Sequence, residues 1–146
     1  IGSGGREHAL CYKLLKSSKI EKLYCIPGNA GTEEIATNIF ADINDFDEIY
    51  KIVLKLNVEL IVVGPEIPLV NGIVDYFEKK NIKIFGPNKK CSQLEGSKFF
   101  MKNICKKYNI PSAKYFEISD INQIEKFLSS VSFPVVVKSD GLAAGK

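Results

Sequence analysis

The 146-residue sequence has no tryptophan, one methionine, one histidine and a single arginine, Arg6. It also has no long apolar segment. Its longest apolar runs are only as long as residues 60–63, whereas a membrane-spanning helix needs about 20 apolar residues. The net charge is only +3, with the lysines scattered along the chain. We therefore expect neither a membrane partner nor a nucleic-acid partner.

Cysteine is sparse, with four residues and no CxxC pair, and one histidine cannot complete a zinc site. The chain is also too long for a small disulfide scaffold. The opening residues lack the charged and apolar pattern of a secretory signal. We expect a cytoplasmic protein whose cysteines are buried, reduced thiols: Cys11, Cys25, Cys91 and Cys105.

The composition, 45% hydrophobic and 25% charged, is that of a globular protein long enough to bury a core. Short apolar segments alternate with segments of helical periodicity. The predicted strands are residues 22–26, 60–63, 83–85, 114–117 and 134–138, and Ile1 is expected to end a strand. The predicted helices are residues 6–17, 45–57, 70–81, 88–95, 97–109 and 120–131.

Apolar strands that alternate with amphipathic helices predict an α/β fold with a buried parallel sheet. Glycine-rich turns follow the first strands directly, at residues 2–5, 28–31, 64–65 and 86–87. The carboxyl ends of parallel strands share one edge of the sheet, where ligands bind. After residue 86 the pattern changes. We expect a Rossmann-like N-terminal domain over residues 1–96 and the beginning of a second domain over residues 97–146.

The first turn, GSGGRE, resembles the dinucleotide fingerprint G-x-G-x-x-G but has Glu7 at the third glycine. The next strand also ends without an acidic residue for a ribose, which argues against NAD. The turn still offers backbone N–H groups at a helix N-terminus, where an anion binds favourably. Arg6 adds a planar fork for phosphate or carboxylate, although a structural salt bridge explains it equally well.

Two more side chains stand near these turns. His8 has no partner visible in the sequence, so a structural role is favoured over a catalytic one. Glu66 follows a buried strand and is expected to point into the ligand crevice, where it could accept from a sugar hydroxyl or an amine.

The last segment, GLAAGK at residues 141–146, does not fit a Walker A loop. It has three residues between its glycines instead of four, and no Ser or Thr is seen after Lys146. A loop of small residues between Lys138 and Lys146 nevertheless suits a polyphosphate, because small side chains let backbone amides approach it.

Five segments share their order and spacing with one known family. They are GSGGREHAL (2–10), PGNAGT (27–32), VVGPE (62–66), LEGSK (94–98) and KSDGLAAGK (138–146). Together they resemble the phosphoribosylamine–glycine ligases, also called glycinamide ribonucleotide synthetases, of the ATP-grasp superfamily. The resemblance covers the whole chain and implies a Rossmann-like domain followed by the beginning of an ATP-grasp domain. Ser139 stands where alanine is more usual in the family.

The resemblance implies a ligase of purine biosynthesis that uses ATP, Mg²⁺, glycine and 5-phosphoribosylamine, with a glycyl phosphate intermediate. The segments that would face phosphoribosylamine contain Gly4, Gly5, Arg6, Glu7, Gly28, Asn29, Gly31, Thr32, Gly64, Pro65 and Glu66. The residues that would face ATP are Lys98, Lys138, Gly141, Ala143, Ala144, Gly145 and Lys146. No metal ligand is assigned within the chain, because the family's Mg²⁺ ligands are expected beyond residue 146.

Two alternatives remain open from the sequence. One is another ATP-grasp enzyme of the biotin-carboxylase or aminoimidazole ribonucleotide carboxylase type, against which the GREH and PGNAGT segments argue. The other is a non-catalytic nucleotide-binding module. Made alone, the 146-residue chain is expected to have no ligase activity, since the implied metal ligands are not in it.

Overall fold

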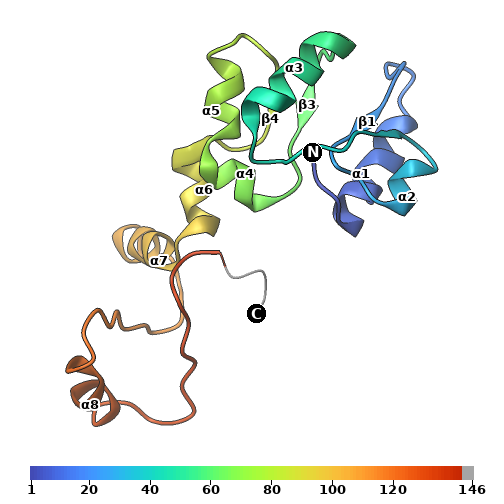
Figure 1. Cartoon of the computed structure of the whole chain (residues 1–146). Coiled ribbons are helices and arrows are strands. Elements are labelled where there is room, and N and C mark those ends of the chain that lie inside the picture. Colours follow the sequence, from blue (N-terminus) through green and yellow to red (C-terminus); the bar gives the residue numbers. More distant parts are fainter. Residues whose placement is uncertain (143–146) are drawn as a thin grey trace. The chain divides into compact units, whose positions relative to one another are not determined.

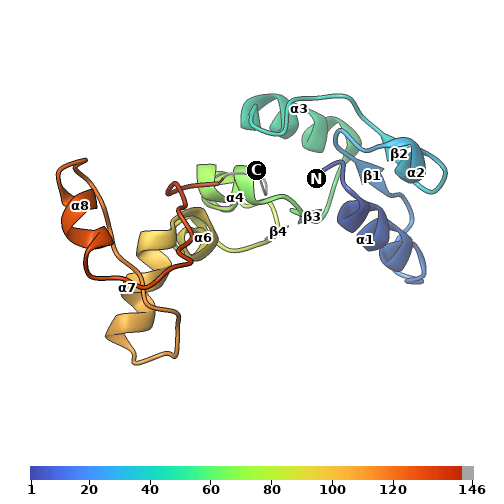
Figure 2. The same ribbon diagram turned by 90° about the horizontal axis from the view of Figure 1, so that it is seen from below.

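A computed structural model describes residues 1–142 of the chain, which divides into two compact units, Ile1–Ser92 and Gln93–Lys146 (Figures 1 and 2). The strands are β1 (Tyr24–Cys25), β2 (Thr37–Asn38), β3 (Ile61–Val62) and β4 (Ile84–Phe85). The helices are α1 (Gly5–Leu15), α2 (Ala30–Glu33), α3 (Phe46–Leu56), α4 (Glu66–Asn71), α5 (Ile73–Glu78), α6 (Lys89–Gly96), α7 (Lys98–Lys107) and α8 (Gln123–Leu128). Each of these helices is too short or too polar to cross a lipid bilayer.

The strands of the first unit form two parallel pairs. β1 pairs with β2, with Tyr24 opposite Thr37, and β3 pairs with β4, with Ile61 opposite Ile84. Parallel pairs need a crossover between their strands. The crossover is α2 in the first pair, and α4 with α5 in the second. The predicted α/β class with a parallel sheet is confirmed.

Ile1 and Gly2 lie between the two strand pairs and hydrogen-bond to both. The Gly2 nitrogen donates to the Ile26 carbonyl (2.6 Å), and Gly28 donates back to the Gly2 carbonyl (3.1 Å). On the other side, the Ile1 nitrogen donates to the Val62 carbonyl (2.7 Å), and Gly64 donates to the Ile1 carbonyl (3.0 Å). The strand order is therefore β2, β1, residues 1–2, β3, β4.

Helices cover this row of strands from two sides. α1 and α3 lie on opposite sides of residues 1–2 in both views (Figures 1 and 2). α3 contributes Ile49 and Val53, one turn apart, to the core, and α5 contributes Ile73 and Phe77. Four-residue spacing places both pairs on a single helix face, as the periodicity of the sequence predicts.

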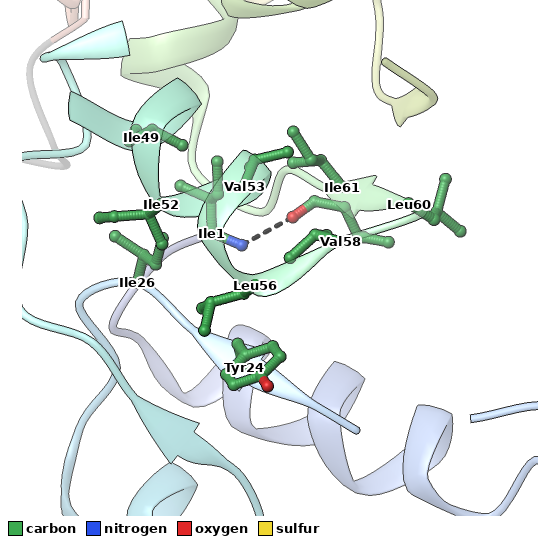
Figure 3. A pocket seen from close by; sticks show the side chains of 11 residues that line it. Ile1, Tyr24, Ile26, Ile49, Ile52, Val53, Leu56, Val58, Leu60 and Ile61 are labelled. Atoms are coloured by element: carbon green, nitrogen blue, oxygen red, sulfur yellow. Dashed lines mark hydrogen bonds between the residues drawn. The ribbon is translucent and has the colours of Figure 1, made fainter. Parts of the chain in front are cut away.

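An apolar hollow opens beside Ile1 at the beginnings of β1 and β3 (Figure 3). Its walls include Tyr24, Leu60 and the apolar face of α3, and every lining side chain is aliphatic except Tyr24. The glycine-rich turns lie at the other ends of these strands. The hollow therefore belongs to the core packing and not to the candidate site.

The predicted helix over residues 70–81 is wrong, because two short helices occupy this region. α4 already begins at Glu66, and Gly72 separates it from α5 with a φ of 98°. This left-handed conformation ends a helix and strongly favours glycine. Pro68 is tolerated in the first turn of α4, where backbone N–H groups have no partner within the helix. α2 and β2 were not predicted from the sequence.

In the second unit, the predicted strands over residues 114–117 and 134–138 are wrong. The structure has no strand at either segment among the described residues. Val136 and Val137 are 80% and 92% exposed. A strand needs hydrogen bonds to a neighbouring strand, and the described residues provide none for these segments. Apolar composition alone therefore overestimated their burial.

All four cysteines are free thiols, as expected, but only two of them are buried. Cys11 of α1 and Cys25 of β1 lie in the interior, and Cys25 donates to the Gly2 carbonyl at 3.4 Å. Burial raises the pKa of the Cys11 thiol to about 11. Cys91 is exposed and Cys105 is half-buried, so the expectation of four buried thiols is wrong for these two.

Candidate functional site

The first glycine-rich turn is organised around the buried side chain of Glu7. Glu7 is only 6% exposed, and one of its oxygens accepts from the Gly4 backbone N–H at 2.7 Å. Gly4 is the N-cap of α1 and has no side chain to satisfy the helix start. Glu7 therefore satisfies the backbone N–H of the cap residue itself, which is one half of a capping box, from the first turn of α1.

Three glycines make room for the Glu7 side chain. A Cβ atom at Gly64 would lie 2.6 Å from Glu7 Cγ, one at Gly2 would lie 2.7 Å from its Cδ, and one at Gly4 would lie 2.8 Å from its Oε2. Gly2 also has a φ of 129°, a conformation that other residues rarely adopt. Glu7 therefore fills the space between the first turn and the Gly64 turn, where the dinucleotide fingerprint would have a third glycine.

Arg6 forms ion pairs with two carboxylates from different turns. Its Nε donates to Glu7 Oε1 at 3.0 Å, and its Nη1 donates to Glu66 Oε1 at 2.8 Å. The structural salt bridge considered for Arg6 is therefore present. The two carboxylates offset a positive charge that would otherwise oppose the dipole at the N-terminus of α1.

Glu66 is the first residue of α4, and its side chain is 41% exposed. The hydrogen bond from Arg6 lowers the pKa of Glu66, with a further contribution from its own backbone N–H. An ionised carboxylate in the first turn also interacts favourably with the helix dipole. Glu66 thus presents a charged acceptor to solvent beside the first glycine-rich turn.

The second glycine-rich turn is tied to the first through Asn29. The Asn29 amide donates to the carbonyls of Ser3 (2.9 Å) and Gly4 (3.2 Å). Asn29 is also the N-cap of α2, where its side-chain oxygen accepts from the Thr32 backbone and its own N–H donates to the Thr32 hydroxyl. This reciprocal capping fixes the turn in the orientation that reaches the first turn.

Asn38 of β2 supports the second turn from the inside and was not found by sequence reasoning. Its amide donates to the Asn29 carbonyl and its oxygen accepts from the Thr32 hydroxyl, both at 2.8 Å. A Cβ atom at Gly28 would lie 2.8 Å from Asn38 Nδ2. The sequence carried no signal for Asn38, because β2 itself was not predicted and asparagine is depleted in strands.

His8 packs against the second turn. A Cβ atom at Gly31 would lie 2.8 Å from both Cε1 and Nδ1 of its ring. Residue 31 must therefore be small for α1 and α2 to approach each other here. This packing contact supports the structural role that the sequence favours for His8.

The residues expected at the nucleotide phosphates lie in the second unit. Lys98, the first residue of α7, donates from Nζ to the Gly141 carbonyl at 2.7 Å, and its backbone N–H donates to Asp140 Oδ1 at 2.7 Å. Lys138 is exposed. Ala143, Ala144, Gly145 and Lys146 lie outside the described residues. Asp140 was not singled out by sequence reasoning.

The parallel sheet, with helices on both sides and glycine-rich turns at the carboxyl ends of its strands, defines a Rossmann-like domain. Comparison with known families then identifies the chain more closely. Phosphoribosylglycinamide synthetase, N domain, matches residues 1–95, and the ATP-grasp (A) domain of the same enzyme matches residues 96–146. The chain belongs to the phosphoribosylglycinamide synthetase family, which confirms the resemblance inferred from its motifs.

Relatives named phosphoribosylamine–glycine ligase, from Caldanaerobacter subterraneus and Clostridium acetobutylicum, are 44% and 45% identical to the chain over 146 residues. The crystal structure of phosphoribosylamine–glycine ligase from Thermotoga maritima matches with a TM-score of 0.72 and 33% identity, over 99% of this chain and 33% of that one. Each match to the two relatives covers 100% of this chain and 35% of the relative. The chain thus spans about a third of their length.

The packing around Glu7 predicts that Gly64→Ala destabilises the chain. The new methyl group would displace a buried carboxylate that is held by Gly4 and Arg6, and overpacking of this kind costs about 1–3 kcal/mol. Urea denaturation of the 146-residue chain measures the loss. Gly5→Ala is the matched control, because a Cβ atom there meets nothing within 4 Å.

A double-mutant cycle tests whether Glu7 is the cause. Glu7→Ala removes the obstructing side chain, so Gly64→Ala should cost less in that background than in the native one. Additive losses would mean that the Gly64 variant is destabilised by something other than Glu7.

The Arg6–Glu66 ion pair predicts a change in the titration of Glu66. Arg6→Met should raise the Glu66 pKa, measured by NMR of the side-chain carboxyl carbon, because it removes the hydrogen bond that lowers it. Lys51→Met, which removes a positive charge from α3 instead, should leave the Glu66 pKa unchanged.

The ion pair also makes stability depend on pH. Because the pKa of Glu66 is lower in the folded than in the unfolded chain, the pair stabilises the fold above the unfolded pKa of about 4.3. This contribution is lost as pH falls through the folded pKa. An unchanged Glu66 titration in Arg6→Met would contradict the ion pair.

Proposed function

We propose that this chain provides the phosphoribosylamine side, and the beginning of the ATP side, of a phosphoribosylamine–glycine ligase. The observation that carries the proposal is the match of two consecutive domains of one enzyme family along the whole chain. In the proposed reaction, the glycine carboxylate takes the γ-phosphoryl group of ATP, which leaves ADP and glycyl phosphate. The amine of 5-phosphoribosylamine then attacks the acyl carbon, releases phosphate and forms the amide of glycinamide ribonucleotide.

The substrate side of the site is formed by the three linked turns of the first unit. Backbone N–H groups at the start of α1 suit the phosphate of 5-phosphoribosylamine, and Arg6 adds positive charge beside them. Glu66, kept ionised by Arg6, is suited to accept from a ribose hydroxyl or the amine. Glu7 and Asn29 fix the turns relative to each other.

The nucleotide side is assigned to Lys98, Lys138 and the segment that begins at Gly141. Lys98 Nζ already lies against the Gly141 carbonyl, so one cation and the beginning of the glycine-rich segment share a location. Phosphate oxygens are stronger acceptors for an ammonium group than a neutral carbonyl. Within residues 1–142, no cluster of three or more His, Cys, Asp or Glu side chains could hold a metal ion. The two side chains assigned to the nucleotide here, Lys98 and Lys138, are cations and would not ligate Mg²⁺ themselves.

The proposal is tested with a completed ligase, in which these 146 residues replace the matching third of the Caldanaerobacter subterraneus relative. The completed ligase should release ADP only when both glycine and 5-phosphoribosylamine are present, and bicarbonate should not substitute for glycine. The remaining two thirds of the relative, made alone, serve as the blank. A folded completed ligase that binds ATP but not 5-phosphoribosylamine would overturn the proposal.

Arg6→Ala in the completed ligase should weaken the use of 5-phosphoribosylamine and leave the KM for ATP nearly unchanged. The loss of one charge-assisted contact corresponds to about 1.5–3 kcal/mol, or roughly 10- to 150-fold in kcat/KM. Glu66→Gln, which keeps the shape and removes the charge, should shift the same parameter in the same direction. A rise in the KM for ATP with normal dependence on the sugar phosphate would contradict the assignment.

Lys138→Met keeps the aliphatic stem and removes the charge. If Lys138 contacts the ATP phosphates, calorimetry on the completed ligase should show affinity for ATP lowered at least about tenfold. The melting temperature without ligand should change little, because Lys138 is exposed. Lys126→Met on α8 is the matched control and should bind ATP normally. Unaltered ATP binding in Lys138→Met would contradict this role and mean that Lys138 is an ordinary solvent-exposed lysine.

A further inference from the structure

The beginning of α7 is completed by a side chain from far along the chain. Ser97, the N-cap, accepts from the Phe100 backbone N–H at 3.1 Å, which satisfies one of the first N–H groups of the helix. Asp140 Oδ1 accepts from the Lys98 backbone N–H at 2.7 Å, although the two residues are 42 positions apart. Asp140 Oδ2 accepts from the Ser97 hydroxyl at 3.0 Å. The carboxylate thus binds both the cap residue and the first residue of α7.

The side chain of Lys98 also contacts the residue that follows Asp140. Its Nζ donates to the Gly141 carbonyl at 2.7 Å, so the backbone of Lys98 binds Asp140 while its side chain binds Gly141. Gly141 has a φ of 91°, and a Cβ atom there would meet nothing within 4 Å. No side chain at residue 141 can hold this segment, and the two hydrogen bonds with Lys98 do so instead.

The negative charge of Asp140 favours its position at the start of α7. Desolvation opposes ionisation of the exposed Asp140 carboxyl, but hydrogen bonds from Ser97 and from the backbones of Lys98, Gly141 and Phe99 outweigh it and lower the pKa of this group. The ionised carboxylate lies at the N-terminus of α7, where the helix dipole favours negative charge. At neutral pH the contact between Asp140 and Lys98 is therefore a charge-assisted hydrogen bond.

We propose that Asp140 is a positioning residue for the nucleotide: it holds the start of α7 against Gly141 and so keeps the Lys98 ammonium where a phosphate group of the nucleotide would replace the Gly141 carbonyl as its acceptor. This inference rests on the proposed function. The Lys98 ammonium donates to a neutral carbonyl oxygen. A short movement of the lysine side chain would let it donate to a phosphate oxygen instead. Without Asp140, residues 140–141 lose their attachment to the start of α7, and the Lys98 ammonium is no longer held at this position.

A purely structural role predicts something different. If Asp140 only capped α7, its loss would lower stability and affect every substrate alike. Asp45 provides the comparison, because it caps α3 by accepting from the Glu48 backbone N–H at 2.9 Å and belongs to the first unit. Removing either carboxylate removes one hydrogen-bond acceptor from the start of a helix, and only the loss of Asp140 would separate Lys98 from Gly141.

The experiment measures calorimetric binding of a non-hydrolysable ATP analogue, and the KM of each substrate, in the completed ligase. Asp140→Ala should weaken analogue binding about tenfold and raise the KM for ATP, with the KM for 5-phosphoribosylamine unchanged. Asp140→Asn keeps a side-chain acceptor for Lys98 and should stay within about threefold of the native affinity. Asp45→Ala should lower the melting temperature and bind the analogue normally.

Binding of the analogue within about twofold of native in Asp140→Ala would overturn the inference and leave Asp140 as an ordinary cap. An equal loss for all three substrates would overturn it as well, by indicating general destabilisation. If the native completed ligase binds no ATP analogue at all, the proposed function itself fails. The outcomes for the two proposals are therefore distinct.

Discussion

The backbone of two residues, Ile1 and Gly2, joins the two strand pairs of the first unit. The β1–β2 pair and the β3–β4 pair are connected along the row by the hydrogen bonds of Ile1 to Val62 and Gly64, and of Gly2 to Ile26 and Gly28. Each pair alone would be a two-stranded ribbon of marginal stability. Because the chain turns directly from Gly2 into the first glycine-rich turn, the central row and the candidate site are set by the same few residues.

That junction explains why the first turn departs from the dinucleotide fingerprint. A third glycine would permit close packing of helix and strand, as in NAD-binding domains. Here Glu7 takes that position, and the space comes instead from Gly2, Gly4 and Gly64. The buried carboxylate satisfies the start of α1 and orients Arg6 toward Glu66. The loss of the third glycine is thus compensated by the three glycines around Glu7. The backbone of the turn stays exposed, and the Glu7 carboxylate holds it from the inside.

Sequence patterns predicted most of the first unit and less of the second. The end of α3 was well placed, because Asn57 adopts the left-handed conformation there and caps the helix, whereas α5 and α7 end at Glu78 and Lys107, before their predicted ends at residues 81 and 109. The interruption at Gly72 was missed, because a lone glycine inside a helical pattern is ambiguous. The strands expected over residues 114–117 and 134–138 failed for another reason: apolar composition indicates that a segment can be buried but does not supply its pairing partner. Asn38 and Asp140 were missed because their roles depend on contacts that no local pattern shows.

The first glycine-rich turn in the first unit and the Asp140–Gly141 segment in the second unit are fixed in the same way. A glycine-rich turn brings backbone N–H groups close to a ligand, but glycine has high backbone entropy and no side chain to fix the turn. In both cases a carboxylate at a helix N-terminus provides the missing attachment. Glu7 binds the first turn to the start of α1, and Asp140 binds its own segment to the start of α7. In both places a basic side chain completes the contact, since Arg6 pairs with Glu7 and Lys98 reaches Gly141. In both units a carboxylate at a helix N-terminus therefore fixes a backbone that the glycines alone would leave free.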